Sequence, residues 1–215
     1  MPADGALILA FDTSAAQCAA ALVRGGRLLD EAVEPMARGQ AERLLPMLEA
    51  LLAGAGLGWA ELDRIAVGTG PGNFTGLRIA VAAARGLALA LGRPAVGVTR
   101  FEALAFGQAG LVEVGLEDGR GRLFLQRFRD GRAEAPPAET VPPAGPDLLC
   151  LGHGAQARAR VAGCRAGSEA VAAGPLRLAE VAAAAPALAP PAPLYLRPAD
   201  AAAPSEAPTR ILDDT

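Results

Sequence analysis

The stretch Ile65–Leu91, IAVGTGPGNFTGLRIAVAAARGLALAL, carries the strongest structural signal in the chain. It begins with a short apolar run, Ile65–Val67, of the kind that forms a buried strand. A glycine-rich turn follows, and from Thr75 the pattern becomes that of a helix of about 17 residues. Thr75 is the expected N-cap of this helix. The stretch therefore predicts a strand, a tight turn and a long helix in succession.

The turn Gly68–Gly76 has two readings. Its glycines permit positive φ angles and the close approach of another backbone or of a ligand. A glycine-rich turn before a helix also presents free N–H groups, which favour an anion. However, the turn lacks the Gly-Lys-Ser/Thr of a P-loop, and its spacing differs from that of the dinucleotide-binding fingerprint. A ligand-free turn and a weak anion site both stay open.

The helix after Thr75 is apolar on nearly every side. Arg78 and Arg85 are its only charges, and their spacing of seven places them on one narrow face. A helix of this kind is buried on more than one side. Small residues recur at every fourth position and form a smooth stripe that lets another helix approach closely: Gly76, Ala80, Ala84 and Ala88. We expect one side to pack on the parent sheet and the other on this chain or on a second protein.

Composition limits the class of protein. A chain of 215 residues forms one large domain or two small ones, and its 52% of hydrophobic residues is ample for a core. The net charge of −3 gives no strong field that would attract nucleic acid. All 20 basic residues are arginine, which excludes Schiff-base chemistry on lysine.

Three features favour a cytoplasmic location. The cysteines Cys18, Cys150 and Cys164 are odd in number and lack metal-ligand spacing, as is common in a reducing compartment. The N-terminus lacks the basic region of a signal peptide, and its apolar run is too short for one. From sequence, we also expect no stretch that is as long and as uniformly apolar as a membrane span.

The first part of the chain predicts three strands followed by alternating helices and strands. Its first helix contains Pro46, which is tolerable only near the start of a helix. The expected elements are, in order, strands at Ala6–Phe11, Gln17–Val23 and Arg27–Val33, a helix that ends at Gly54, the strand and helix of Ile65–Leu91, a strand at Ala95–Val98 and a helix that ends near Phe106.

The second part repeats this pattern more weakly. Its proline-rich segment Ala133–Pro146 is expected to be a surface loop, and the tail from Ala199 has a disordered composition. Two parts that each begin with a hairpin suggest a duplicated α/β unit, with domains at 1–106 and 107–215. The expected elements are strands at Leu111–Glu117, Arg122–Arg129 and Leu148–Leu151, and helices at Ala155–Val161 and Leu176–Ala185.

Asp12 is the first candidate for chemistry. It follows the first expected strand and lies beside the hydroxyls of Thr13 and Ser14. A carboxylate at the carboxyl end of a strand is where α/β folds often hold a metal–phosphate group. In a simple turn, the same carboxylate accepts a hydrogen bond from its own backbone. In the first reading, a vestigial nucleotide or phosphate turn is formed by Asp12, Gly70, Gly72 and Gly76.

Other polar side chains give weaker signals. His153, the one histidine of the chain, lies between two glycines and is interpreted as a loop histidine. Asp12, Glu102 and Asp118 could meet in a cleft, where they would form at best a weak Mg²⁺ site. A loose basic cluster, of the kind that usually forms a solvated face, consists of Arg158, Arg160 and Arg165.

Five motifs resemble, in order and spacing, those of the TsaB family, also known as YeaZ. They are FDTS at Phe11–Ser14, QAERLLPML at Gln40–Leu48, GPGNFTGLR at Gly70–Arg78, LEDGRG at Leu116–Gly121 and PLYLR at Pro193–Arg197. Proteins of this family are the partner subunit of the bacterial machinery that makes threonylcarbamoyladenosine in tRNA. The resemblance implies a two-domain fold similar to actin, to sugar kinases and to the catalytic relative TsaD. Each domain of that fold is an RNase H-like mixed sheet with helices, and a cleft lies between the domains.

The resemblance also implies a subunit without catalytic residues. TsaD-like enzymes carry two histidine metal ligands after the strand that corresponds to Ala95–Val98. This chain has Arg100 and Leu104 at those positions, and neither side chain holds a metal. We therefore expect no metal and no cofactor of its own, with ATP or ADP binding only at a joint interface with partner subunits.

In TsaB relatives, the helices that match Gln40–Ala53 and Thr75–Leu91 form a bundle with a second copy or with TsaD. We expect a TsaD-type catalytic subunit and a TsaE-type ATPase as partners, a homodimer in isolation, contact with tRNA only through the complex, and no membrane. Charge added at Leu48 or Leu77 is expected to abolish pairing and leave the fold intact. The expected interface residues are Leu44, Met47, Leu48, Leu51, Phe74, Thr75, Leu77, Arg78 and Val81.

A second function stays open. It is an active ATPase or phosphotransferase of the actin-like fold, which would use Asp12 and the turns Gly68–Gly76 and Gly152–Gly154 to bind a nucleotide. Titration of the isolated protein with ATP and Mg²⁺ separates the two functions.

Overall fold

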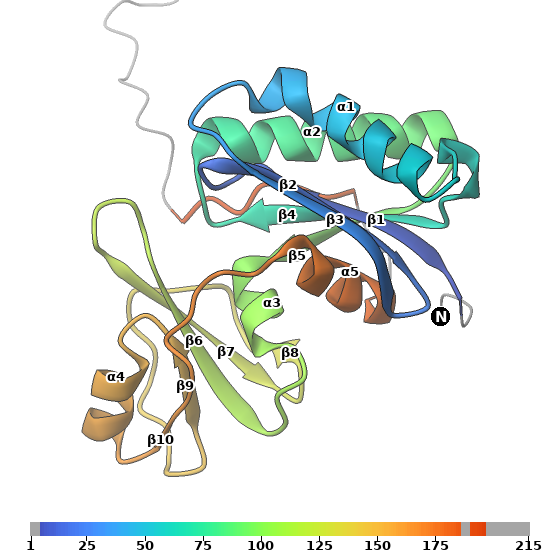
Figure 1. Cartoon of the computed structure of the whole chain (residues 1–215). Coiled ribbons are helices and arrows are strands. Elements are labelled where there is room, and N and C mark those ends of the chain that lie inside the picture. Colours follow the sequence, from blue (N-terminus) through green and yellow to red (C-terminus); the bar gives the residue numbers. More distant parts are fainter. Residues whose placement is uncertain (1–4, 186–189, 197–215) are drawn as a thin grey trace, which may run out of the picture.

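The computed structural model describes residues 5–185 and 190–196 as two five-stranded sheets with helices packed on them (Figure 1). The tail from Ala199, and Arg197 of the last motif, lie outside the described residues. The expected domains at 1–106 and 107–215 correspond to one sheet each, but their boundary stays a prediction.

The first sheet has the strand order β3-β2-β1-β4-β5. The pairs β1–β2 and β2–β3 are antiparallel, whereas β1–β4 and β4–β5 are parallel. The central strand β1 is buried at every position, as its unbroken apolar sequence predicts. The strands are β1 Leu7–Asp12, β2 Gln17–Arg24, β3 Arg27–Pro35, β4 Arg64–Gly70 and β5 Ala95–Thr99.

The second sheet repeats this order as β8-β7-β6-β9-β10, with the same pattern of strand directions. Its strands are β6 Leu111–Glu117, β7 Leu123–Arg129, β8 Arg132–Ala133, β9 Leu149–Gly152 and β10 Arg165–Ala166. The sequence did not predict β8 and β10, because two residues are too short to show a period. The repeated topology confirms the duplicated, RNase H-like mixed sheets of the actin-like fold.

Helices cover both faces of the first sheet (Figure 1). On one face, α1 Gln40–Gly54 and α2 Phe74–Leu91 enclose the largest apolar core, which includes Leu9, Leu48 and Ile65. On the other face lies α5 Pro175–Ala184, which comes from the far end of the described chain. A short 3₁₀ helix, η1 Trp59–Glu61, precedes β4.

The two parts of the chain exchange helices. The helix α3 Arg100–Ala105 follows the first sheet, yet its Phe101 lies in the core of the second sheet. Conversely, α5 follows the second sheet, and its Leu178 lies in a core of the first sheet. The expected second domain, 107–215, therefore contains a helix that packs on the first sheet. The remaining helix, α4 Ala155–Ala162, packs on β9 and β10.

The long helix α2 corrects the expected N-cap and the expected lack of an apolar stretch of membrane-spanning length, and it shows which way the small-residue stripe faces. Its N-cap is Asn73 rather than Thr75, because the Oδ1 atom of Asn73 accepts a hydrogen bond from the N–H of Gly76 at 3.0 Å. Its small-residue stripe faces its own chain: a Cβ atom at Gly76 would lie 1.9 Å from the carbonyl oxygen of Thr13. The helix is also long and apolar enough to cross a membrane, although one such helix is weak evidence for a span. Here it packs along β4.

The first helix differs from expectation at Pro46. Since α1 begins at Gln40, Pro46 lies inside the helix rather than near its start. Proline has no N–H, so the carbonyl of Glu42 loses its usual partner. Both residues face solvent, where water can satisfy that carbonyl.

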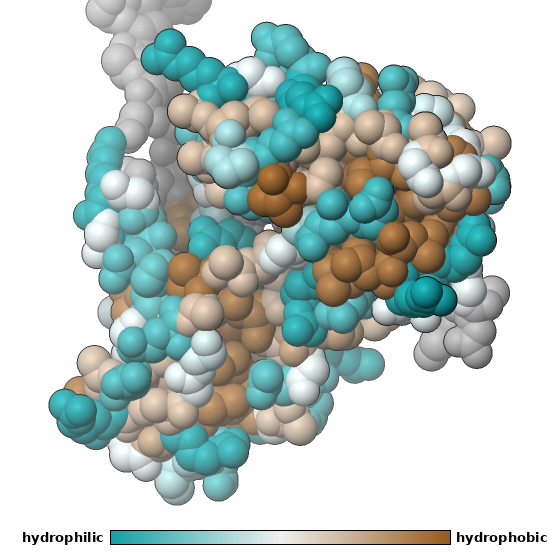
Figure 2. All heavy atoms as spheres, in the orientation of Figure 1, coloured by the Kyte–Doolittle hydropathy of each residue, from teal (hydrophilic) through white to brown (hydrophobic). Residues whose placement is uncertain are grey.

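The edge strand β3 exposes apolar side chains. Figure 2 shows hydrophobic atoms gathered over the part of the first sheet where Figure 1 draws β3. Leu28, Leu29 and Val33 of this strand are between 38% and 49% exposed. Two charged residues, Asp30 and Glu31, lie between Leu29 and Val33. Such charges blunt the tendency of an open sheet edge to pair with another chain.

Candidate functional site

Two turns at the carboxyl ends of β1 and β4 interlock. The hydroxyl of Thr13 donates to the carbonyl of Gly76 at 2.7 Å, and the N–H of Asn73 donates to the carbonyl of Ser14 at 2.7 Å. A Cβ atom at Gly72 would lie 2.7 Å from the Cβ atom of Ser14, and one at Gly68 would lie 2.1 Å from Oδ2 of Asp12. The glycines are therefore needed because the neighbouring turn fills the space beside them. This packing favours the ligand-free reading of the turn.

Asp12 is buried between these turns. Its carboxylate accepts a hydrogen bond from the backbone N–H of Ser14, as in the simple-turn reading. Burial raises the pKa of Asp12, while the hydrogen bonds to Ser14 and the charge of Arg100 act in the opposite direction. The role of Asp12, Gly70, Gly72 and Gly76 as a vestigial phosphate turn stays a prediction.

Arg100 connects the two parts of the chain beside Asp12. Its guanidinium donates to the carbonyl of Pro71 at 3.2 Å and to the carbonyl of Val171 at 2.9 Å. Burial lowers the pKa of Arg100, and the charge of Asp12 partly offsets this effect. A fixed cation thus lies near Asp12.

The other two carboxylates of the weak Mg²⁺ site considered from sequence accept hydrogen bonds from residues close to them in the chain. Glu102 accepts hydrogen bonds from the N–H and the hydroxyl of Thr99, at 2.7 and 2.8 Å, and so caps α3. Asp118 accepts from the N–H groups of Arg120 and Arg122 in the β6–β7 turn, at 2.8 and 2.9 Å. Within residues 5–185 and 190–196, no three His, Cys, Asp or Glu side chains form a group that could hold a metal. Asp12, Glu102 and Asp118 therefore do not meet as the weak Mg²⁺ site that the sequence left open, as far as the described residues show.

His153 lies in a loop, as predicted. Its side-chain Nδ1 atom accepts a hydrogen bond from the backbone N–H of Glu117 at 3.0 Å, and its backbone N–H donates to the carbonyl of Gly115 at 2.8 Å. The side chain fastens the end of β6 to the loop after β9.

Most of the expected interface residues lie inside the protein. Six of them are at most 4% exposed, namely Leu44, Met47, Leu48, Leu51, Leu77 and Val81. A side chain buried in its own chain offers no surface to a partner while the fold is kept. The prediction that charge at Leu48 or Leu77 would spare the fold is therefore wrong, because an unpaired charge is costly in a core. Helical periodicity located the apolar stripes but could not tell which of them faces the sheet.

Two exposed members of that set, Phe74 and Arg78, form a cluster with Tyr195. The Cζ atom of Arg78 lies 3.8 Å from the centre of the Phe74 ring, and the rings of Phe74 and Tyr195 are 5.1 Å apart. The Nε atom of Arg78 donates to the hydroxyl of Tyr195 at 3.1 Å. Tyr195 is held by Leu194, whose N–H donates to the carbonyl of Thr69 at 2.8 Å. Sequence reasoning missed Tyr195 as a site residue, although the motif PLYLR pointed to it.

Two further exposed apolar side chains lie elsewhere on the two outer helices. Leu89 of α2 is 86% exposed and Leu45 of α1 is 45% exposed, while Phe74 and Tyr195 are both 41% exposed. Thr75 is also exposed. We call the set Leu45, Phe74, Arg78, Leu89 and Tyr195 the outer helix face. Exposed apolar side chains beside an arginine are typical of a protein–protein contact surface.

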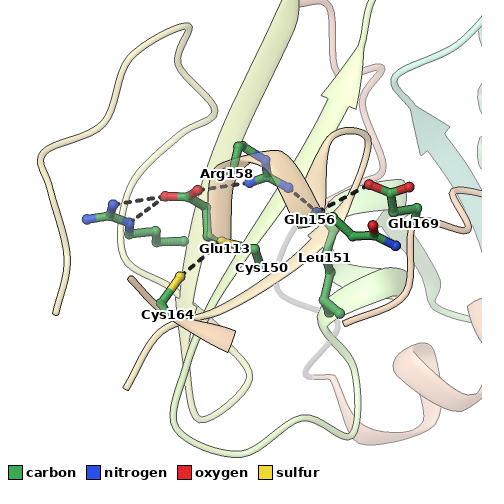
Figure 3. A network of polar contacts seen from close by, with 8 residues as sticks. Glu113, Cys150, Leu151, Gln156, Arg158, Cys164 and Glu169 are labelled. Carbon is green, nitrogen blue, oxygen red and sulfur yellow. Dashed lines mark hydrogen bonds and ion pairs between the residues drawn. The ribbon is translucent and has the colours of Figure 1, made fainter. Parts of the chain in front are cut away.

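The second sheet buries a charged network instead (Figure 3). Glu113 of β6 is 4% exposed and forms ion pairs with Arg127 and Arg158, both at 2.8 Å. Arg158 also donates to the carbonyl of Leu151. The predicted basic cluster of Arg158, Arg160 and Arg165 is therefore not a single solvated face, because Arg158 points inward.

The fold and this site define a two-domain, actin-like protein with an exposed apolar face on its outer helices. Residues 33–118 match the family model of TsaD, described as tRNA N6-adenosine threonylcarbamoyltransferase. The structure resembles that of an uncharacterized *Pseudomonas aeruginosa* protein with similarity to the peptidase YeaZ. The two are 30% identical with a TM-score of 0.68, over 89% of this chain and 100% of that one. YeaZ of the same organism is 28% identical with a TM-score of 0.65, over the same shares.

Two curated relatives extend the comparison. An uncharacterized protein of *Mycobacterium tuberculosis* is 40% identical over 133 residues, which are 61% of this chain and 63% of that protein. The tRNA threonylcarbamoyladenosine biosynthesis protein TsaB of *Haemophilus influenzae* is 38% identical over 100 residues, which are 46% of this chain and 41% of that protein. These matches thus span less than two thirds of either relative. Together with the motifs and the *Pseudomonas* structures, they show that the chain belongs to the TsaB (YeaZ) family.

Proposed function

We propose that this chain is the non-catalytic partner subunit of a cytoplasmic complex that forms threonylcarbamoyladenosine in tRNA. It pairs with a TsaD-type catalytic subunit, which transfers the threonylcarbamoyl group to N6 of the adenosine next to the anticodon. The observation that supports this proposal most is membership of the TsaB family, because the *Haemophilus* relative is named for this biosynthesis.

The geometry around Asp12 supports the non-catalytic part of the proposal. Arg100 already places a positive charge near this carboxylate and is held by two backbone carbonyls. The space beside Gly68 and Gly72 is filled by Asp12 and Ser14 of the same chain. A nucleotide phosphate would have to displace these groups, so we infer that ATP or ADP binds only at an interface shared with partner subunits.

The outer helix face supports the pairing part of the proposal. Leu45 and Leu89 offer exposed apolar area on the two helices that form a bundle in TsaB relatives. Beside them, Arg78 stacks on Phe74 and uses its Nε atom for Tyr195, so its terminal nitrogens suit an acidic group at the rim of a partner. The same face serves a second copy of the chain when the catalytic subunit is absent, and a TsaE-type ATPase joins at the shared interface.

Co-purification with the TsaD-type subunit of the same organism tests the proposal. We expect a stable complex, and tRNA modification by the purified components only when this chain is present. Modification that proceeds equally well without the chain would contradict the proposal. The isolated chain is also titrated with ATP and Mg²⁺ in a calorimeter. Binding together with turnover by the chain alone would favour the phosphotransferase alternative.

A further inference from the structure

Cys150 and Cys164 lie side by side although 14 residues separate them along the chain. Their Sγ atoms are 3.6 Å apart (Figure 3). Cys150 belongs to β9, and Cys164 lies in the short connection between α4 and β10. Because β10 pairs in parallel with β9, the connection returns Cys164 to the strand that carries Cys150. The contact therefore follows from the topology of the second sheet.

The two thiols differ in their access to solvent. Cys150 is fully buried with Leu148, Ala155 and Ala159, whereas Cys164 is partly exposed. Burial, together with the hydrogen bond between the two thiols, raises the pKa of Cys150 to about 12. Cys150 is thus shielded from oxidants in solution, because a buried thiol cannot be reached by them. An oxidant that reaches this pair meets Cys164 first.

We propose that Cys150 and Cys164 are a modification site, where a small peroxide converts the thiol pair into an intramolecular disulfide. In the first step, Sγ of Cys164 attacks one oxygen of hydrogen peroxide and the O–O bond breaks. The sulfur becomes a sulfenic acid, and the departing hydroxide takes the thiol proton and leaves as water. In the second step, Sγ of Cys150 attacks this sulfur while its thiol proton passes to the sulfenic oxygen, and the S–O bond breaks to release that oxygen as a second water. Two thiols lose two electrons in total, and one peroxide becomes two waters.

The surroundings allow the sulfurs to close the remaining distance. A disulfide bond is about 2.05 Å long, so the sulfurs must approach each other by roughly 1.5 Å. The strand β9 is held by Arg158, which donates to the carbonyl of Leu151 next to Cys150. Cys164, which lies on a short connection, therefore has to make this movement. In a reducing compartment, such a bond is a transient response to oxidant, and it joins β9 to the connection between α4 and β10.

Peptide mapping of the full-length native protein tests the proposal. The protein is treated with hydrogen peroxide, free thiols are alkylated, and trypsin is added without reductant. Trypsin cleaves after Arg158 and Arg160, which lie between the two cysteines, so a disulfide joins peptide 133–158 to peptide 161–165. We expect this linked peptide after peroxide and its loss after dithiothreitol. Alkylation of both thiols after peroxide, or sulfinic acid on Cys164 without a link, would overturn the proposal.

Two further measurements control for other oxidation. Cys18 lies in the core of the first sheet and should remain a thiol, so a link between Cys18 and either of the other cysteines would contradict the proposal. Thermal unfolding of oxidised protein should move upward by roughly 5 °C, because the bond closes a short loop around α4. Cys164→Ser, a change at a partly exposed position, should show no such shift. A peroxide-induced rise of equal size in Cys164→Ser, or none in the wild type, would rule out this bond as the cause.

Discussion

The two sheets share one strand order but bury their helix-covered faces in different ways. Under α1 and α2, the first sheet encloses an apolar core with fully buried leucines such as Leu9 and Leu48. The corresponding place on the second sheet has no second helix, because residues 134–148 between β8 and β9 form a loop. Under α4, that sheet buries Glu113 between two arginines. The same topology thus tolerates a large apolar core or a small one supplemented by charges, depending on how much helix covers it.

The largest effect is expected from charge in the apolar core. Leu48→Glu should cost roughly 5 kcal/mol or more of unfolding free energy, because it removes a buried leucine and buries an unpaired carboxylate. That is comparable to the total stability of many domains. We expect loss of the folded state, measured by circular dichroism.

Leu45→Glu is the matched control, because Leu45 lies on the same helix and is 45% exposed. Its stability should change by about 0.5 kcal/mol or less. Equal destabilisation by the two variants would show that α1 does not bury the face described here.

The next effect tests the charged core of the second sheet. Glu113→Gln leaves Arg127 and Arg158 without their counter-charge and should cost about 3 kcal/mol, measured by urea unfolding. The comparison variant is Glu134→Gln, which breaks the ion pair with Arg129 at the same distance of 2.8 Å but at an exposed position. That change should cost less than about 1 kcal/mol. Similar losses of unfolding free energy in both variants would mean that burial does not determine how much an ion pair contributes to stability.

A smaller effect separates the surfaces of the two sheets. Leu89→Glu on the outer helix face should weaken pairing with the TsaD-type subunit about tenfold, which corresponds to about 1.4 kcal/mol. Val161→Glu on α4 changes a side chain that is equally open, at 91% exposure compared with 86%, and should leave pairing unchanged. Pull-down and light scattering measure both variants. If only Val161→Glu lost pairing, the contact surface would lie on the second sheet instead of on the outer helix face.

The smallest effect concerns the start of α2. Asn73→Ala removes the side chain that caps Gly76 and should cost about 1 kcal/mol. Thr75→Ala, at the position that the sequence favoured as the cap, should change stability by only a few tenths of that amount. The two thermal midpoints, measured side by side, decide which residue caps the helix.

Strong and continuous patterns were sufficient to predict most of the elements. The buried strand β1 and the long helix α2 followed from apolar runs and periodicity. The strands β8 and β10 were missed because two residues give no pattern. Repetition of hairpins along the chain was enough to suggest the duplication that the two strand orders confirm.

The candidate site could be predicted only in part. Periodicity identified the apolar positions of α1 and α2, but which stripe faces the sheet depends on how the helices dock, so Leu48 was assigned to the wrong side. Contacts between distant residues were also out of reach. Tyr195 meets Arg78 across 117 residues, and Cys150 meets Cys164 only because two strands pair in parallel.

The helix exchange has a consequence for how this protein is made. A nascent chain emerges from its N-terminus, so all five strands of the first sheet are synthesised before α5. Until Leu178 and its neighbours leave the ribosome, one apolar side of that sheet remains open to water. The early part of the chain therefore cannot complete its folding alone, and cutting the protein at the link between the sheets would leave both fragments with uncovered cores.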